Sequence, residues 1–585
     1  MIDSRLLVED YLKKNAWAVE ENSNTPFGLG AMQRYFGEEV AKEYWLNVIY
    51  TEEISEMHRS GDFHIHDLGG LTLYCCGYSL LQIIMKGVVG IPNVPRSKPA
   101  RHFASIINHI TNLTTAFQNE IKGAVAFNSV DTLLAPFVKV DNLSYEEVRQ
   151  NMQNMIFSLN SNSRMGAEPA FSNMTFDLTP ARDLKDQYAW IGNKQADFKY
   201  SDCQKEMDMI NRAFFDIMLA GDADGKPLAY PIPTYNVWEG FDWDNPNLEG
   251  LWKMAGKYGY PYFANFINSD LDAGDVRSMC CRLNLDLTEL RKRNGGLFGS
   301  ADSTGSIGVV TINLPRIAYK NKDDMGEFYK ELKHKMKVAA HSLELKREWL
   351  QKNILNTRAI PAYMEYVGTM MNHFNTIGII GMNEMCENML GIGIDTDMGK
   401  AWSKDVLKFM REVLVELQED TGHLYNLEAT PAEGCTYSLA KKDREKFPGI
   451  VTQGTDYAPY YTNSCHLPVS KVENITQLVE HQNDLQSLFT GGTVVHFYLE
   501  GSIEPEQAKH IVKSVCSKYK LPYISLSPVN SFCEEHGMVE HTEGRCPMCG
   551  REVEMYQRVT GYIRKVKYFN RGKKSEFKDR VQLSV

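Results

Sequence analysis

The sequence predicts an α/β fold in which much of a parallel sheet is buried. Short apolar, β-branched runs, typical of buried strands, alternate with longer stretches in which apolar residues recur at helical spacing. The strand-like runs lie at residues 307–317, 377–382, 494–498 and 523–526. At 585 residues and 66.6 kDa the chain exceeds the usual size of a single core, so we expect a large domain with smaller appendages.

Three helices can be read directly from the spacing of apolar residues. The first begins at a capping box, Ser144 to Glu147, which satisfies free backbone amides at a helix start. The apolar positions of the three helices are Val148, Met152, Ile156 and Leu159; Phe328, Leu332, Met336, Ala339 and Leu343; and Leu407, Met410, Leu414 and Leu417. The third helix is expected to stop near Gly422.

The composition excludes several classes of protein. It is ordinary for a globular chain, with 43% hydrophobic and 23% charged residues and a mean hydropathy of −0.35. A net charge of −11 argues against a nucleic-acid or anionic-membrane partner. No apolar run reaches membrane-spanning length, and the first residues lack the apolar core of a signal peptide. We therefore expect a cytoplasmic protein, whose twelve cysteines serve catalysis, metal binding or packing rather than disulfides.

The character of the chain changes near Val529, where we place a domain boundary. The next segment has the layout of a zinc ribbon, with two pairs of ligands three residues apart: Cys533 and His536, then Cys546 and Cys549. His541 is an alternative ligand, and the other interpretation is a pair of free cysteines in a loop. Four protein ligands leave no open position, so the zinc is expected to be structural.

Gly561 lies in an Arg-Val-Thr-Gly-Tyr string between this ribbon and a basic tail. Taken alone, the glycine predicts a turn or a close backbone approach. A backbone glycine can also store a radical, because the two flanking amide groups stabilise an unpaired electron on its α-carbon.

Two pairs of adjacent cysteines, Cys75–Cys76 and Cys280–Cys281, lie far apart in the sequence. Buried, inert cysteines are the simpler interpretation. The second pair follows a polar loop, however, and a thiol there can act as a nucleophile or as a hydrogen-atom donor in radical chemistry. Adjacent side chains on extended backbone point in opposite directions, so only one cysteine of each pair should reach a common site.

The radical-compatible glycine, the ribbon before it and the Cys-Cys-Arg loop occur together, and further blocks accompany them along the chain. The blocks lie at residues 61–69, 233–236, 265–283, 304–316, 422–434 and 461–468. In this order they resemble an anaerobic (class III) ribonucleoside-triphosphate reductase, a glycyl radical enzyme that makes deoxyribonucleotides, the precursors of DNA replication.

The resemblance implies a ten-stranded α/β barrel of the glycyl radical enzyme and ribonucleotide reductase type, made of two five-stranded parallel halves. Residues 1–529 would form this barrel, with little or no N-terminal ATP cone. Residues 530–552 would form the zinc ribbon, and residues 553–585 the glycyl radical loop and basic tail.

The same resemblance implies catalytic roles. Gly561 would carry the stored radical, Cys281 would become the transient thiyl that removes the 3′-hydrogen of the substrate, and Cys75 would supply reducing equivalents. Cys280 and Cys76 remain the alternatives within each pair.

Ser306 departs from the family's pattern, because members that use formate carry an asparagine there. This favours reduction of a cysteine pair that includes Cys75 by a thioredoxin or glutaredoxin. Cys465 either joins such a relay or fills space. Without formate a carboxylate should act as acid or base, and Glu433 is the candidate; the alternative is a surface or helix-capping glutamate.

The block from Thr462 to His466 begins with three small polar residues. Such a run is suited to binding a triphosphate through its backbone amides. Turn formation is the alternative interpretation. The expected substrate-binding residues are Thr462, Asn463, Ser464, Cys465 and His466, together with His64 and His66. The two histidines are two residues apart and share a face if the backbone is extended; they would then line the active site or be hydrogen-bonded structurally.

The resemblance also implies partners: ribonucleoside triphosphates as substrates, ATP and dNTP effectors, and a second copy of the chain in a homodimer. An activating enzyme that uses S-adenosylmethionine and an iron–sulfur cluster would install the radical. The rival interpretations are a pyruvate formate-lyase-like acyltransferase and a non-enzymatic zinc-ribbon protein that binds nucleic acid.

Overall fold

The computed structural model describes residues 2–13, 27–161, 168–268, 303–539, 542, 544–559 and 561–585, and the backbone of strands β9 (Val276–Ser278) and β10 (Asn284–Asp286). Its central feature is a sheet whose main path has ten strands. In spatial order they are β13 (Leu424–Glu428), β12 (His373–Ile380), β11 (Gly305–Asn313), β2 (Cys75–Gly77), β3 (Val125–Phe127), β4 (Ser172–Phe176), β7 (Ile232–Val237), β8 (Tyr262–Asn265), β17 (Tyr523–Pro528) and β16 (Val495–Leu499).

The ten strands form two parallel halves that run in opposite directions. Strands β2, β3, β4, β7 and β8 are mutually parallel, as are β11, β12 and β13 and, on the other side, β16 and β17. The two antiparallel seams are β2 with β11 and β8 with β17. The predicted division into two five-stranded halves is therefore confirmed. A further strand, β1 (Phe63–Ile65), pairs antiparallel with β11.

The loop before β16 joins the two ends of this path. The backbone amide of Gly491 donates to the carbonyl of Leu427 at 2.7 Å, and the amide of Ala429 donates to the carbonyl of Gly492 at 2.7 Å. Because these bonds link the end of β13 to the segment that precedes β16, they close the sheet into a barrel without a direct ladder between the two strands.

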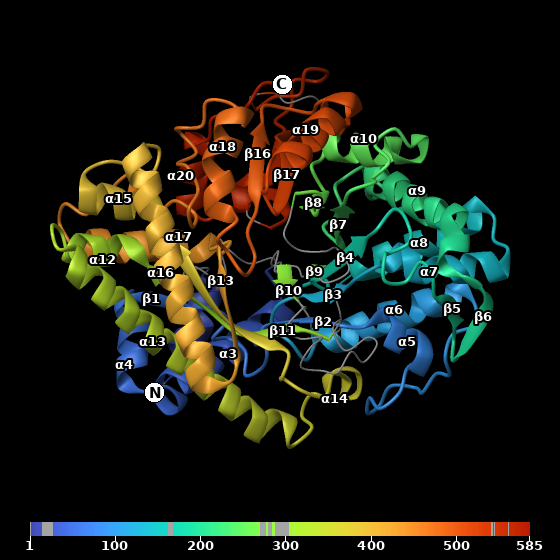
Figure 1. The fold of residues 1–585 in the computed structure, drawn as a ribbon, viewed down its shortest axis with the longest axis horizontal. Coiled ribbons are helices and arrows are strands. Elements are labelled where there is room, and N and C mark those ends of the chain that lie inside the picture. The colour runs from blue at the N-terminus through green and yellow to red at the C-terminus, as the bar shows by residue number, and fades with distance from the viewer. Residues whose placement is uncertain are drawn as a thin grey trace.

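Helices surround the strands (Figure 1). They are α1 (Ser4–Leu12), α3 (Leu29–Tyr44), α4 (Glu52–Ser60), α5 (Leu80–Lys86), α6 (Phe103–Gln118), α7 (Val130–Asp141), α8 (Tyr145–Leu159), α9 (Gln204–Ala220), α10 (Glu249–Lys257), α12 (Leu314–Lys320), α13 (Met325–Leu350), α14 (Pro361–Tyr366), α15 (Met382–Leu390), α16 (Asp397–Thr421), α17 (Glu433–Lys446), α18 (Ile475–Gln486), α19 (Pro505–Lys518) and α20 (Arg571–Asp579). Within the described ranges, no helix is both long and apolar enough to cross a membrane.

The three predicted helices are present as α8, α13 and α16. The capping box of α8 forms between Ser144 and Glu147, and α16 ends at Gly422, whose φ of 73° is the left-handed conformation that favours glycine. The apolar run at 307–317 is only partly a strand. Strand β11 ends at Asn313, because the Asn313 side chain caps α12 and Pro315 occupies its first turn.

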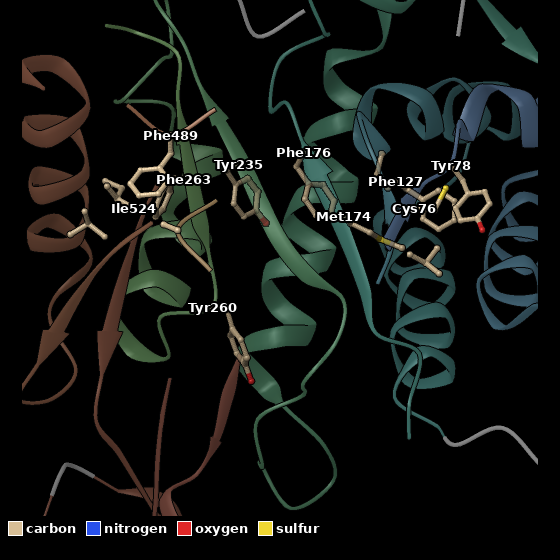
Figure 2. Packing of buried hydrophobic residues seen from close by; sticks show 14 of the residues in the cluster. Cys76, Tyr78, Phe127, Met174, Phe176, Tyr235, Tyr260, Phe263, Phe489 and Ile524 are labelled. Carbon is tan, nitrogen blue, oxygen red and sulfur yellow. The ribbon is translucent and has the colours of Figure 1, made fainter. Parts of the chain in front are cut away.

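The two faces of the barrel wall have different chemistry. Alternate strand residues point outward into the hydrophobic core under the helices, where Cys76, Phe127, Met174 and Phe263 pack (Figure 2). Their neighbours in the strands point inward, and many of these inner residues are buried polar side chains. They include Asn173, Thr175, Thr234, Ser306, Thr376, Asn426 and Glu428. A polar interior of this kind suits a polar ligand rather than a packed core.

The C-terminal residues form a separate four-stranded antiparallel sheet. Its order is β19 (Gly537–Val539), β18 (Asn530–Cys533), β20 (Glu554–Arg558) and β21 (Ile563–Lys565). Because β18 pairs with both β19 and β20, the ribbon segment and the Gly561 segment share one sheet. The remaining small sheets are β5 (Tyr188–Ile191) with β6 (Lys194–Lys199), β9 with β10, and β14 (Gln453–Gly454) with β15 (Pro459–Tyr460).

Candidate active site and metal centre

Gly561 lies in the turn of the β20–β21 hairpin, between the paired residues Arg558 and Ile563. Its carbonyl oxygen accepts a hydrogen bond from the Tyr262 hydroxyl at 2.7 Å and another from Arg558 Nη1 at 3.2 Å. Tyr262 belongs to barrel strand β8, and the neighbouring Tyr562 packs on the apolar cluster around it. The hairpin turn is therefore held against the inner wall of the barrel.

The last helix and the tail hold this hairpin in place. Arg580 donates to the Gln557 side chain at 2.6 Å and to the Arg558 carbonyl at 3.1 Å. It also pairs with Glu576 at 2.7 Å and lies 4.0 Å from the centre of the Tyr498 ring. Arg580 thus connects α20, strand β20 and barrel strand β16 through one buried guanidinium.

Cys75 and Ser306 face each other across the β2–β11 seam. They are direct partners in the antiparallel ladder, so their side chains lie on the same, inner face. The Cys75 sulfur accepts from the Ala124 amide at 3.3 Å, and a side chain at Gly123 would clash with it, since its Cβ would be 2.4 Å away. The Ser306 hydroxyl lies 3.2 Å from the hydroxyl of Thr376.

Cys76 points in the opposite direction from Cys75, into the outer hydrophobic core. Figure 2 shows it beside Tyr78 and near Phe127 and Met174. Burial raises the pKa of its thiol above the usual range, so it has no tendency to ionise. Of this pair, only Cys75 faces the barrel interior. Cys280 and Cys281 lie outside the described residues.

His64 and His66 lie together on and just after β1. Their rings are 4.7 Å apart, as expected for residues two positions apart on extended backbone. His66 Nε2 is 2.8 Å from the Thr311 hydroxyl, which in turn donates to Thr430 at 3.0 Å. Burial lowers the pKa of His64 well below its usual range, so that its ring is neutral.

The block from Thr462 to His466 has mixed surroundings. The amide and hydroxyl of Thr462 both donate to the buried carboxylate of Glu384, at 3.0 and 2.7 Å. Cys465 lies in the hydrophobic core against Gln482. By contrast, Asn463 Oδ1 and Ser464 Oγ are buried and have no hydrogen-bond partner among the residues that the structure describes.

A cavity of about 50 Å³ adjoins this block. Its lining includes Asn463, His466, His496 and Glu576. His466 Nε2 is 2.9 Å from the Val494 carbonyl, which connects the block to the loop before β16. Strand β16 and the C-terminal tail therefore meet at this cavity.

Glu433, the first residue of α17, points at the Gly561 hairpin. Its carboxylate accepts from the Tyr562 hydroxyl at 3.2 Å and lies 3.7 Å from Arg564. Burial raises the pKa of this carboxyl, although the charge of Arg564 acts in the opposite direction. The carboxylate is thus placed next to the predicted radical loop.

Two residues of the inner face were not identified from the sequence. Glu428 is 1% exposed and its ladder partner is Gly378, with Thr430 and Thr311 close by. Tyr262 holds Gly561. Both residues lie in strands in which alternate side chains point to opposite faces. Because both faces of these strands are buried, the sequence does not show which face lines the barrel interior.

The four predicted zinc ligands converge. Their ligand atoms all lie within 4.8 Å of one another, with Cys533 Sγ 3.6 Å from Cys549 Sγ and His536 Nδ1 3.7 Å from Cys533 Sγ and from Cys546 Sγ. Zinc–sulfur bonds of about 2.3 Å in a tetrahedron give ligand separations of about 3.8 Å, so the group fits Zn²⁺. The alternative ligand, His541, lies outside the described residues.

Comparisons with known proteins agree over nearly the whole chain. A family model of anaerobic ribonucleoside-triphosphate reductase matches residues 21–583. The enzyme of that name from Escherichia coli (strain K12) is 24% identical, covering 97% of this chain and 84% of its own length. The enzyme of Enterobacteria phage T4 is also 24% identical, covering 97% of this chain and 98% of its own length.

Solved structures share the fold. An anaerobic ribonucleotide reductase superposes with a TM-score of 0.78 at 20% identity, covering 99% of this chain and 92% of its own. The Thermotoga maritima enzyme in complex with dATP and CTP gives 0.77 at 20% identity, covering 98% and 94%. Hydroxyproline dehydratase from Clostridioides difficile gives 0.61 at 10% identity, covering 100% and 89%.

Proposed function

Because the chain belongs to the anaerobic ribonucleoside-triphosphate reductase family, we propose that Gly561 stores the glycyl radical with which this family converts ribonucleoside triphosphates into 2′-deoxyribonucleoside triphosphates. One observation carries the assignment: Gly561 lies in a hairpin turn that is held against the inner wall of a ten-stranded barrel. A turn at that position can exchange a hydrogen atom with a thiol inside the barrel while the wall excludes solvent.

Cys281, by the resemblance of its loop, is the thiol that takes up the unpaired electron. Its sulfur removes the 3′-hydrogen of the ribose as a hydrogen atom. The C2′–O bond then weakens, and the protonated 2′-hydroxyl leaves as water. Two electrons and two protons from a pair of thiols reduce the remaining keto radical, and Cys281 returns the hydrogen atom to C3′. The overall balance is one triphosphate and two thiols in, one deoxytriphosphate, one disulfide and one water out.

Cys75 is proposed as one of the two reducing thiols. It is the only member of its pair on the inner face, and the seam places Ser306 opposite it. A serine at this position in place of asparagine argues against formate as the reductant. A thioredoxin or glutaredoxin would therefore reduce the disulfide that includes Cys75.

The acid–base role is assigned to Glu433, whose carboxylate is partly buried next to the Gly561 hairpin and whose pKa is raised. Glu428 is the second candidate, because it is a fully buried carboxylate on the inner face of β13. Comparing the Glu→Gln changes at the two positions distinguishes them.

The triphosphate is assigned to the block from Thr462 to His466. Asn463 and Ser464 offer buried polar atoms without a described partner, which is the state expected of groups that a ligand completes. Thr462 and Cys465 hold this loop in place, because Thr462 donates a hydrogen bond to Glu384 and Cys465 donates one to Gln482. His64 and His66 lie beside Thr311 of β11, and β11 pairs with β12, whose last residue Ile380 bridges to Asn463.

The remaining partners follow from the family. We propose a homodimer that binds ATP and dNTP effectors, in line with the dATP and CTP of the Thermotoga maritima complex. An activating enzyme with an iron–sulfur cluster would generate the radical from S-adenosylmethionine. Zn²⁺ would be held by Cys533, His536, Cys546 and Cys549 and would stabilise the sheet that carries Gly561. The reaction is expected in the cytoplasm.

The test is an anaerobic assay of the activated protein with a ribonucleoside triphosphate. We expect 2′-deoxy product with a thioredoxin or glutaredoxin system, and none with formate alone. Gly561→Ala should abolish the product, whereas Gly37→Ala, on the exposed side of α3, should not. Product with formate alone would overturn the interpretation of Ser306, and acyl exchange without deoxy product would overturn the function.

A further inference from the structure

Two side chains far from Gly561 in the sequence converge on its carbonyl oxygen. Tyr262 donates its hydroxyl hydrogen at 2.7 Å, and Arg558 donates through Nη1 at 3.2 Å. The same Nη1 also donates to the Tyr262 hydroxyl oxygen. The Arg558 guanidinium, the Tyr262 hydroxyl and the Gly561 carbonyl are therefore joined by three hydrogen bonds. The positive charge of Arg558 polarises the Tyr262 hydroxyl, which itself donates to the Gly561 carbonyl.

Both donors are held rigidly. The Tyr262 ring stacks on Tyr523, with centres 5.2 Å apart, within a small apolar cluster of the inner wall. The Arg558 guanidinium lies 4.4 Å from the centre of the Tyr262 ring, donates from Nε to Ser527 at 3.2 Å and bonds the Gly259 carbonyl through Nη2. Neither donor can leave the carbonyl without breaking several other contacts.

Anchoring of the hairpin explains part of this arrangement, but a neutral donor would suffice for that. A buried arginine, 2% exposed, brings a full charge to a carbonyl that is already hydrogen-bonded. Hydrogen bonds that involve a charged group are about twice as strong as neutral ones, and successive bonds strengthen one another in a dry environment. The arrangement therefore concentrates electron withdrawal on one particular carbonyl group.

An unpaired electron on a glycine α-carbon is stabilised by donation from the amide nitrogen and withdrawal by the carbonyl. Donors to the carbonyl oxygen increase the withdrawal and keep the carbonyl in the plane of the delocalised system. We propose that Tyr262 and Arg558 are positioning residues that set the lifetime and the spin distribution of the radical stored on Gly561. This inference rests on the proposed function.

The test compares Tyr262→Phe with Tyr523→Phe in the full-length protein. Each change removes one phenolic hydroxyl from the same cluster, but the Tyr523 hydroxyl bonds to Thr234 rather than to Gly561. After anaerobic activation, electron paramagnetic resonance gives the hyperfine coupling of the remaining α-hydrogen and the decay of the signal. We expect Tyr262→Phe to change the coupling and shorten the lifetime by about three- to ten-fold, the range of one lost hydrogen bond, with no change in Tyr523→Phe.

A fluorinated tyrosine at position 262 provides the matched rescue, since it keeps the ring and the hydroxyl but donates more strongly. It should keep at least the wild-type lifetime and shift the coupling away from the wild-type value, in the direction opposite to any shift in Tyr262→Phe. Because this variant keeps the hydroxyl, it can be compared with the wild-type protein even if Tyr262→Phe does not fold. An unchanged coupling and lifetime in both Tyr262 variants, with a normal wild-type signal, would overturn this role alone. Absence of any glycyl signal from the wild-type protein would overturn the proposed function and this role together.

Discussion

Replacing Arg580 by methionine should loosen the segment that carries Gly561. The Arg580 side chain is fully buried, pairs with Glu576, and donates to Gln557 and to the Arg558 carbonyl on strand β20. Methionine fills a similar volume but leaves these acceptors without their donor. Removing one partner of a buried ion pair lowers the stability by about 3–5 kcal/mol. We expect the lower end, about 3 kcal/mol, because Glu576 keeps its second partner, Lys573.

Hydrogen exchange of the native protein is the suitable assay, because a chain of this size need not unfold in one step. A loss of about 3 kcal/mol corresponds to roughly a hundredfold faster exchange through local opening. The faster exchange should be confined to peptides from β20, β21 and α20, while peptides from β3 and β4 should be unchanged. Arg5→Met is the control, because the Arg5–Glu9 pair is on the surface, with 84% and 36% exposed side chains.

Arg580 does not anchor the segment if Arg580→Met accelerates exchange in β20 and α20 no more than Arg5→Met does. An acceleration spread evenly over the barrel would also contradict this anchoring role, because the contacts of Arg580 are with the C-terminal sheet, the last helix and one barrel strand. Where the prediction holds, the yield of radical on activation should fall with it, since β20 carries Arg558.

Three further predictions concern single residues. His536→Ala should lose the one bound zinc per chain, measured by metal analysis, whereas His541→Ala should keep it, because His536 lies with the three cysteines. Cys75→Ala should abolish deoxynucleotide formation with a redoxin, whereas Cys76→Ala should retain it and cost only packing. Burial beside a guanidinium lowers the pKa of His373 to about 3, so below pH 6.5 the unfolded chain binds a proton at this residue and the folded protein does not. The free energy of unfolding should therefore fall by up to about 1.4 kcal/mol per pH unit from pH 6.5 towards 3. In His373→Gln the denaturation midpoint should fall less steeply with decreasing pH than in the wild-type protein.

Each of these has a clear contradicting result. Zinc retained in His536→Ala would mean a different ligand set. Equal activity of the two alanine variants would remove Cys75 from the reducing pair. A His373→Gln variant with the wild-type slope between pH 6.5 and 5 would show that another group accounts for the pH dependence.

The set of four metal-ligating residues could be predicted because its signal is local. Two ligand pairs, each three residues apart, define a ribbon without knowledge of the rest of the chain, and the four side chains do meet. Gly561 taken alone predicts only a turn, and its radical role rests on the resemblance. Periodicity alone gave only an α/β fold with a buried sheet; the division into two five-stranded halves came from the resemblance. Cys75 and Ser306 are paired where β2 meets β11, although they lie far apart in the sequence. No local sequence pattern specifies a pairing between such distant residues.

The details that the sequence did not reveal depend on which way a buried strand faces. Alternation shows that Cys75 and Cys76 point apart, but only the pairing with β11 shows which one is inside. Thr462 belongs to the block that the sequence predicts to bind the triphosphate, and the structure adds that its amide and hydroxyl both donate to Glu384 of α15. Tyr262 lies in an apolar run that reads simply as core, and its role depends on a contact with Gly561. Such contacts between distant segments are fixed by tertiary packing.

The most direct test of the central claim is electron paramagnetic resonance of the activated protein prepared with ordinary and with α-deuterated glycine. A single α-hydrogen splits the signal of a glycyl radical into a doublet, and deuterium collapses that splitting. We predict a doublet from the wild-type protein, its collapse with deuterated glycine, and no signal from Gly561→Ala. A doublet that persists in Gly561→Ala, or that deuterated glycine leaves unchanged, would contradict the assignment of the radical to Gly561.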